Sequence, residues 1–171
     1  MVEDNSLQKQ FIESYDQFAD DIFKHCFFRV SDKEVAIDMM QEVFTKVWKY
    51  VDDGNDIHNI RAFLYKVANN MIIDYYRKKK SVSLDKIEEG REVPFEIEDV
   101  GADEKILSES EVKIISGFLE KLEEPYKQAV VLRYIEGMSI DEIVEVTGES
   151  NNNVSVRINR GIKKLKKLIN E

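Results

Sequence analysis

Apolar residues recur every three or four positions through most of the chain, which is the spacing of amphipathic helices. The spacing predicts seven helices, over about 7–30, 31–50, 60–80, 108–122, 125–136, 139–148 and 151–169. Only two prolines and seven glycines interrupt the 171 residues, few for a chain of many tight strands and turns. We therefore expect an all-α protein.

Helix start and stop signals reinforce this pattern. An S-x-x-E sequence, the form of a capping box, begins at Ser31, Ser108 and Ser139. Gly148 is placed to end the helix that Ser139 begins, and a basic helix follows within a few residues. A short helix, a glycine-bearing turn and a basic helix form the helix-turn-helix pattern of DNA-binding proteins.

The stretch 81–107 has no sustained period and contains Pro94 and two glycines. It carries nine acidic residues against three basic ones. Such a segment is typical of a linker. The prediction is two small helical domains, 1–80 and 108–171, joined by a flexible acidic linker at 81–107.

Composition excludes several classes of function. Hydrophobic residues make up 43% of the chain and charged residues 35%, a globular balance. The single cysteine, the polar N-terminus and the lack of a long apolar run predict a cytoplasmic protein with no membrane insertion. His25 and His58 stand alone, with no P-loop glycines and no cysteine cluster, so we expect no enzyme, no metal and no cofactor.

The net charge of −9 argues against a nucleic-acid partner, but its distribution does not. Basic residues gather in the run 77–80 and, without an acid among them, at Arg157, Arg160, Lys163, Lys164, Lys166 and Lys167. Two basic ends on two helical modules predict an interface for a polyanion. Taken singly, each run is equally compatible with cations that favour a helix C-terminus.

Three helix faces are candidate surfaces. The last helix presents Asn152, Ser155, Val156, Asn159, Arg160 and Lys163 opposite an apolar face of Val154, Ile158, Ile162, Leu165 and Ile169. The helix 60–80 presents basic and amide residues with Phe63, Tyr65 and Tyr76 between them, either as stacking faces for bases or as core. The helix 31–50 presents Asp38, Gln41, Glu42 and Thr45, either as a solvated face or as a docking strip for a protein.

Two stretches together resemble one family. IDMMQEVFTKVW with NIRAFLYKVANNMIIDYYRKKK resembles the second region of bacterial RNA polymerase sigma factors. LEEPYKQAVVLRYIEGMSIDEIVEVTGESNNNVSVRINRGIKKL resembles their fourth region. The two-region layout is similar to the extracytoplasmic-function (ECF) group. The resemblance implies a non-catalytic initiation subunit, monomeric when free, that binds core RNA polymerase and promoter DNA, with an anti-sigma factor as a further candidate partner.

The resemblance also implies residue roles. The clamp helices of the largest polymerase subunit would be met by Ile37, Asp38, Met40, Gln41 and Glu42, with Met39 as an added apolar contact. The −10 element would be met by Asn55, Asn59, Phe63, Asn70, Asp74, Arg77 and Lys78. The −35 element would be met by Asn153, Ser155, Val156, Asn159, Arg160 and Lys163. The second module would also meet the flap of the second-largest subunit.

Several residues of the last helix depart from the family pattern, namely Asn152, Asn153, Ser155, Val156, Gly161 and Ile162, which puts the usual −35 preference in question. Gly161 replaces a common alanine and is expected to weaken the helix by about 1 kcal/mol. The rival hypothesis is a stand-alone helix-turn-helix regulator that binds duplex DNA as a dimer. It would not need the polar strip of the second predicted helix.

Overall fold

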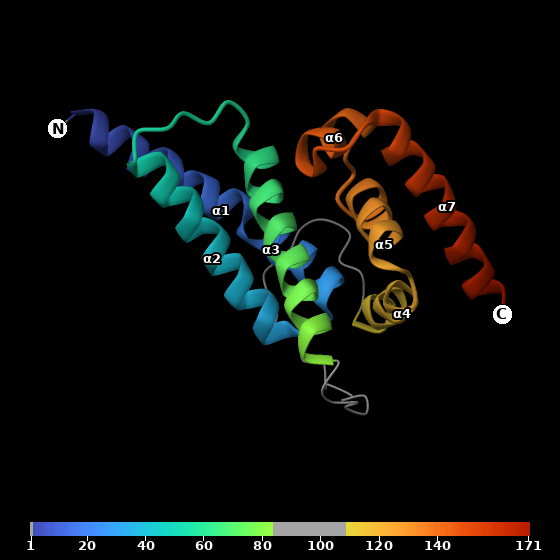
Figure 1. The fold of residues 1–171 in the computed structure, drawn as a ribbon. Helices are drawn as coiled ribbons and strands as arrows, with labels where there is room; N and C mark the ends of the chain where they lie inside the picture. Colours follow the sequence, from blue (N-terminus) through green and yellow to red (C-terminus); the bar gives the residue numbers. More distant parts are fainter. Residues whose placement is uncertain (1, 84–108) are drawn as a thin grey trace.

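The computed structural model describes residues 2–83 and 109–171, with side chains from 6 to 81 and from 110 to 171. Every element in these two ranges is helical, and none is a strand. Three long helices form the N-terminal half, and a group of shorter helices with the long C-terminal helix lies beside them (Figure 1). The predicted linker lies outside the described residues, apart from 81–83, which extend the third helix.

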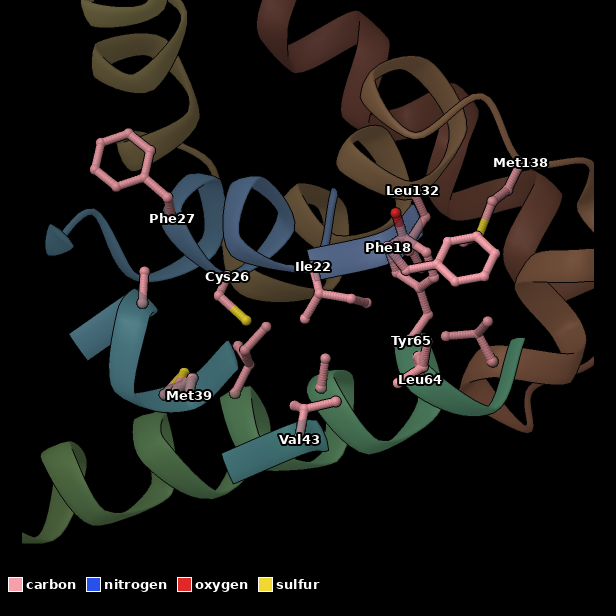
Figure 2. Close-up of a cluster of buried hydrophobic side chains, with 14 of the residues drawn as sticks. Phe18, Ile22, Cys26, Phe27, Met39, Val43, Leu64, Tyr65, Leu132 and Met138 are labelled. Carbon is pink, nitrogen blue, oxygen red and sulfur yellow. The ribbon is translucent and has the colours of Figure 1, made fainter. Parts of the chain in front are cut away.

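The N-terminal half consists of α1 (Val2–Val30), α2 (Lys33–Asp52) and α3 (Ile60–Ser83). Side chains such as Ile22, Val43 and Leu64, one from each helix, are completely buried where the three helices meet (Figure 2). Aromatic rings of α1 and α2 extend this core towards the N-terminus, where Phe11 packs against Trp48 at 4.9 Å between ring centroids. The apolar spacing of the sequence therefore predicted these helices correctly.

The start of α2 differs from the prediction. Ser31 is not the N-cap, because its φ of 56° places it in the left-handed region. The next residue, Asp32, caps the helix instead, and its carboxylate accepts a hydrogen bond from the Val35 amide at 3.0 Å. The helix also buries Met39 rather than Met40, which is only half-buried.

The C-terminal half consists of α4 (Glu109–Glu120), α5 (Glu124–Val130), α6 (Ile140–Thr147) and α7 (Asn151–Asn170). Pro125 stands in the first turn of α5, as predicted. The helix does not continue regularly to Gly137, since residues Val131–Ile135 widen into the π-helical segment η1. The predicted capping box at Ser108 lies outside the described residues.

The helix-turn-helix signals are confirmed. Ser139 and Glu142 form the reciprocal capping box of α6, and Gly148 ends that helix with a φ of 74°. Ser150 then caps α7 by accepting a hydrogen bond from the Asn153 amide at 3.2 Å. These caps satisfy backbone groups that the two helix ends would otherwise leave unpaired.

The two halves share one buried core. Leu132 and Met138 of the C-terminal half point towards Phe18 and Tyr65 of the N-terminal half (Figure 2). Helix α6 packs directly against α3. The division into independent domains stays a prediction, since the described halves lie in contact.

Candidate nucleic-acid interface

The outward face of α7 carries polar side chains that are mostly exposed to solvent. Asn153, Asn159, Arg160 and Lys163 are exposed, Val156 is 36% exposed and Ser155 is half-buried. Val154 and Ile158 on the opposite face are buried against the rest of the C-terminal half. Amide and guanidinium groups on such a face can contact both base edges and phosphates in a major groove.

Two of the six basic residues of α7 bind within the protein. Arg157 pairs with Glu149 across the turn that precedes the helix. Lys164 pairs with Glu123 at 3.0 Å and lies 4.4 Å from the centre of the Tyr126 ring. These two cations anchor α7 to the turn and to the start of α5. Fewer of the positive charges of α7 are therefore available to a ligand than the sequence indicates.

Ile169 was expected on the packed face of α7, and this prediction was wrong, because its side chain is 55% exposed. The helix runs past the end of the core it packs against. Gly161 also has a different role from the one predicted. A Cβ at this position would lie 2.7 Å from Val130 Cγ2 and 3.3 Å from the Tyr126 carbonyl oxygen. The glycine allows α7 to approach α5 closely, which offsets its low helix propensity.

Helix α3 has two polar faces with different surroundings. Asn70, Asp74, Arg77 and Lys78 are exposed, and Asp74 pairs with Arg77 at 2.8 Å. Tyr65, for which a stacking face and a core position were both open, is buried against the C-terminal half. Asn69, expected among the amide residues of the exposed face, is buried there as well. The run 77–80 continues the exposed face to the end of the helix.

A groove of about 290 Å³ lies between α2 and α3. Its wall is formed by residues of both helices, which are Lys46, Tyr50, Phe63, Val67, Asn70, Met71 and Asp74. The rings of Tyr50 and Phe63 lie 4.8 Å apart, at 35° to each other. The sequence does not single out Lys46 and Tyr50, which lie about one helical turn apart on the polar side of α2.

The loop between α2 and α3 supplies two more of the predicted residues. Asn59 caps α3, because its side-chain oxygen accepts a hydrogen bond from the Ala62 amide at 3.1 Å. Asn55 donates from its side chain to the Tyr50 carbonyl at 3.0 Å. Both side chains are exposed, so each retains polar atoms that face solvent.

The polar strip of α2 is exposed as a continuous surface at Asp38, Gln41, Glu42 and Thr45, with Ile37 and Met40 half-buried beside it. Met39 cannot contribute to this surface, since it is 7% exposed and belongs to the core. The strip lies on a different helix from the polar face of α7. The chain thus presents at least three separate polar surfaces.

Groups with strongly displaced pKa values lie away from these surfaces, where the two halves meet. Burial raises the pKa of Glu136 to about 7, although the Tyr65 hydroxyl donates to its carboxylate at 2.5 Å. Burial also raises the pKa of Tyr65 and lowers the pKa of His25, which the nearby Arg29 lowers further. These residues are placed to hold the halves together rather than to meet a ligand.

Within residues 2–83 and 109–171, no helix is both long and apolar enough to span a membrane. No group of three or more histidine, cysteine or carboxylate side chains in these ranges is arranged to hold a metal ion.

Comparison with known proteins identifies similar sequences for both halves. Residues 14–82 match the family described as Sigma-70 region 2, and residues 113–165 match that described as Sigma-70, region 4. The RNA polymerase sigma factor SigZ of Bacillus subtilis is 30% identical over 157 residues, which cover 91% of this chain and 84% of that protein. The ECF RNA polymerase sigma factor SigW of the same organism is 28% identical, over 96% of this chain and 91% of its own length.

A solved structure shares the fold. The sigma factor RpoE of Bartonella quintana, crystallised in complex with the anti-sigma factor NepR, superposes with a TM-score of 0.73 at 18% identity. The match covers 95% of this chain and 98% of that one.

Proposed function

Since this chain belongs to the sigma-70 family and to its extracytoplasmic-function group, we propose that it binds core RNA polymerase through α2 and contacts a promoter through α3 and α7. As an ECF sigma factor it directs transcription initiation. The observation that carries the residue assignments is the outward polar face of α7 in a helix-turn-helix whose two helices are both N-capped by serine side chains.

For the −35 element, the exposed face of α7 is the reading surface. Asn153, Asn159 and Arg160 have the amide and guanidinium groups that hydrogen-bond base edges in a major groove. Lys163 is placed one turn further on, where it meets the phosphate backbone. Ser155 and Val156 complete the surface with a small polar and an apolar contact.

For the −10 element, the groove between α2 and α3 receives an unpaired base. Tyr50 and Phe63 offer ring faces for stacking, which is worth about 1–3 kcal/mol per base. Asn70 and Asp74 at the same groove offer hydrogen-bonding groups. Asn55, Asn59, Arg77 and Lys78 extend this surface along the strand at the two ends of α3.

For the polymerase, the strip of Asp38, Gln41 and Glu42 is the docking surface on the clamp helices of the largest subunit, with Ile37 and Met40 as the apolar contacts beside it. The C-terminal half meets the flap of the second-largest subunit. We place the protein in the cytoplasm, where polymerase acts. An anti-sigma factor is a further partner, supported by the complex in which the structurally similar Bartonella protein was solved.

A stand-alone regulator accounts for less of the chain, because it needs a helix-turn-helix alone and leaves the match of residues 14–82 unused. One experiment distinguishes the sigma factor from the stand-alone regulator. In it, the protein is mixed with core polymerase from the organism that encodes it. We expect a stoichiometric complex on size exclusion and discrete transcripts from sheared genomic DNA. A free dimer that shifts duplex DNA, with no polymerase complex, would instead support the regulator.

A further inference from the structure

One ion pair joins the turn of the helix-turn-helix to the helix that follows it. Arg157 of α7 donates from its guanidinium to the carboxylate of Glu149, which lies eight residues earlier in the turn between α6 and α7. Both side chains are mostly buried, with 33% of Arg157 and 29% of Glu149 exposed. The second carboxylate oxygen of Glu149 is buried and has no hydrogen-bond partner among the described residues. This carboxylate therefore depends on Arg157 for its compensation inside the fold.

The backbone that carries Glu149 has little freedom to move. Its amide donates to Thr147 Oγ1 at 3.3 Å, and the same hydroxyl donates to the Ile143 carbonyl of α6 at 2.8 Å. On either side of Glu149, Gly148 ends α6 and Ser150 caps α7. The carboxylate therefore extends from a turn that is bonded to α6, and it can hold a guanidinium of α7 in one place.

The pair lies where three helices of the C-terminal half meet. A cavity of about 10 Å³ adjoins it, and its lining includes Gln128 of α5, Ile143 of α6 and Val154 of α7. A cavity of this volume has room for about one water molecule. It therefore offers the guanidinium of Arg157 no second position inside the fold. Without its contact to Glu149, this side chain could turn only to solvent.

Arg157 adjoins residues that are proposed to read DNA. Residues three and four positions apart lie on the same side of a helix, so Asn153 and Arg160 are its exposed neighbours along α7. Arg157 itself points back to the turn through its contact with Glu149. Atoms that hydrogen-bond a ligand must be held to within about 0.5 Å of their working positions. A small displacement of α7 at Arg157 would therefore affect both of its exposed neighbours.

We propose that Glu149 and Arg157 are positioning residues for recognition of the −35 element, and that neither contacts DNA. The ion pair holds the N-terminal part of α7 against α5 and α6, in the position from which Asn153 and Arg160 reach base edges. This inference rests on the proposed function, in which α7 reads the −35 element. Arg157 then contributes to specificity through the fold and not through its charge at the polyanion.

The test measures how well polymerase carrying this sigma factor distinguishes two DNA duplexes. One is a promoter found by transcription of genomic DNA, and the other is the same promoter with its −35 base pairs replaced. The ratio of the two dissociation constants reports recognition of the −35 element. A variant that only lowers the amount of folded sigma factor weakens binding to both duplexes alike, so it leaves this ratio unchanged.

Arg157→Gln should reduce the ratio about tenfold, which is comparable to the loss of one base contact. The reason is that the carboxylate of Glu149 is left without its cation. Lys164→Gln is the matched control, because it removes the same charge two turns further along α7 from a pair with Glu123. We expect this control to keep the wild-type ratio, and an unchanged ratio in Arg157→Gln would overturn the inference.

Two changes at Glu149 separate positioning from a direct contact of Arg157 with DNA. Glu149→Gln removes no cation, yet it should lower the ratio, whereas a DNA contact of Arg157 would be strengthened by loss of the competing carboxylate. Glu149→Arg combined with Arg157→Glu re-forms the pair in reverse and should recover most of the ratio. A DNA contact could not be recovered in this way, because the exchange puts an acid towards the phosphates. Circular dichroism checks that each variant keeps the wild-type helix content.

Salt dependence gives a second and independent measurement. Each phosphate contact of a cation contributes about 0.9 to the slope of log K against log salt concentration. Arg157→Gln should leave this slope unchanged, whereas Lys163→Gln, at a position proposed to meet the backbone, should lower it by about 0.9. A lower slope for Arg157→Gln would overturn the inference. A wild type that does not distinguish the two duplexes would contradict the proposed function itself, whereas a wild type that does so leaves the variants to decide on the ion pair alone.

Discussion

Gly161 of α7 packs so closely against Val130 of α5 that a Cβ added to the glycine would lie 2.7 Å from Val130 Cγ2. Val130 is itself 3% exposed, and its branched side chain has little room to move away. The close approach of the two helices therefore depends on the absence of a side chain at position 161. Gly161, which helix propensity alone counts as destabilising, therefore contributes to the packing of α7.

Gly161→Ala is accordingly expected to destabilise the protein. Alanine would improve helix propensity by about 1 kcal/mol, but overpacking against Val130 costs about 1–3 kcal/mol. The net change is a loss of about 1 kcal/mol in the free energy of unfolding, measured by urea denaturation. In a Val130→Ala background the same substitution should cost less, because the clash is relieved. Strict additivity of the two substitutions would contradict this explanation.

Glu136→Gln is expected to change the pH dependence of stability. Because burial raises the pKa of Glu136 from 4.5 to about 7, the folded protein holds that proton more tightly than the unfolded chain. The contribution of this bound proton to the free energy of unfolding is complete below pH 4.5 and is lost as pH rises through about 7. Glutamine stays neutral and still accepts from Tyr65.

The difference in unfolding free energy between Glu136→Gln and wild type should therefore be larger at pH 8 than at pH 5, by about 2 kcal/mol in favour of the variant. Urea denaturation at the two pH values measures it. A difference that does not vary with pH would show that Glu136 ionises normally in the fold.

Arg160→Ala is expected to weaken promoter binding. If its exposed guanidinium contacts a base edge, the loss is about 1–3 kcal/mol. Binding of polymerase with this sigma factor to a promoter found by transcription of genomic DNA measures the effect. Lys166→Ala, which removes the same charge further along α7, should have a much smaller effect. Equal losses for the two variants would mean that Arg160 acts only through its charge.

The polymerase-docking strip can be tested by a matched pair of double variants. Asp38→Lys with Gln41→Lys reverses the strip on α2, and Asp16→Lys with Gln17→Lys makes the same chemical change at exposed positions on α1. Only the first should weaken binding to core polymerase, by tenfold or more, with no change in helix content. Unchanged affinity and transcription in the α2 variant would remove the strip from the interface.

The sequence predicted those parts of the fold that depend on neighbouring residues. The capping box of Ser139 and Glu142 spans three positions, and the left-handed end of α6 depends on Gly148 itself, so a local pattern specifies both. Ser31 shows the limit of such rules, since two adjacent residues could cap α2 and the chain uses Asp32. Met39 and Met40 illustrate the same ambiguity for burial.

The polar contacts between the N-terminal and C-terminal halves could not be predicted, because the residues that make them are far apart in sequence. Asn69 looks like part of a solvated helix face until Arg29 and Gln128, 40 and 59 residues away, are placed beside it. The sequence leaves Tyr65 open between a stacking face and the core, because its helical spacing is compatible with both. The same holds for Gly161, whose role is visible only when α5 lies against α7. Most of the predicted DNA-reading and polymerase-binding residues are exposed, whereas Ile37, Met40, Phe63 and Ser155 are half-buried, and the roles of all of them stay predictions.

Cys26, the single cysteine of the chain, lies in the core of the N-terminal half at 0% exposure. Burial raises the pKa of its thiol to about 12, so almost none is present as the reactive thiolate at neutral pH. A cysteine introduced on the surface would therefore take up a maleimide dye selectively, with Cys26 left in place. Under native conditions, the slow alkylation of Cys26 itself would measure how often this core opens to solvent.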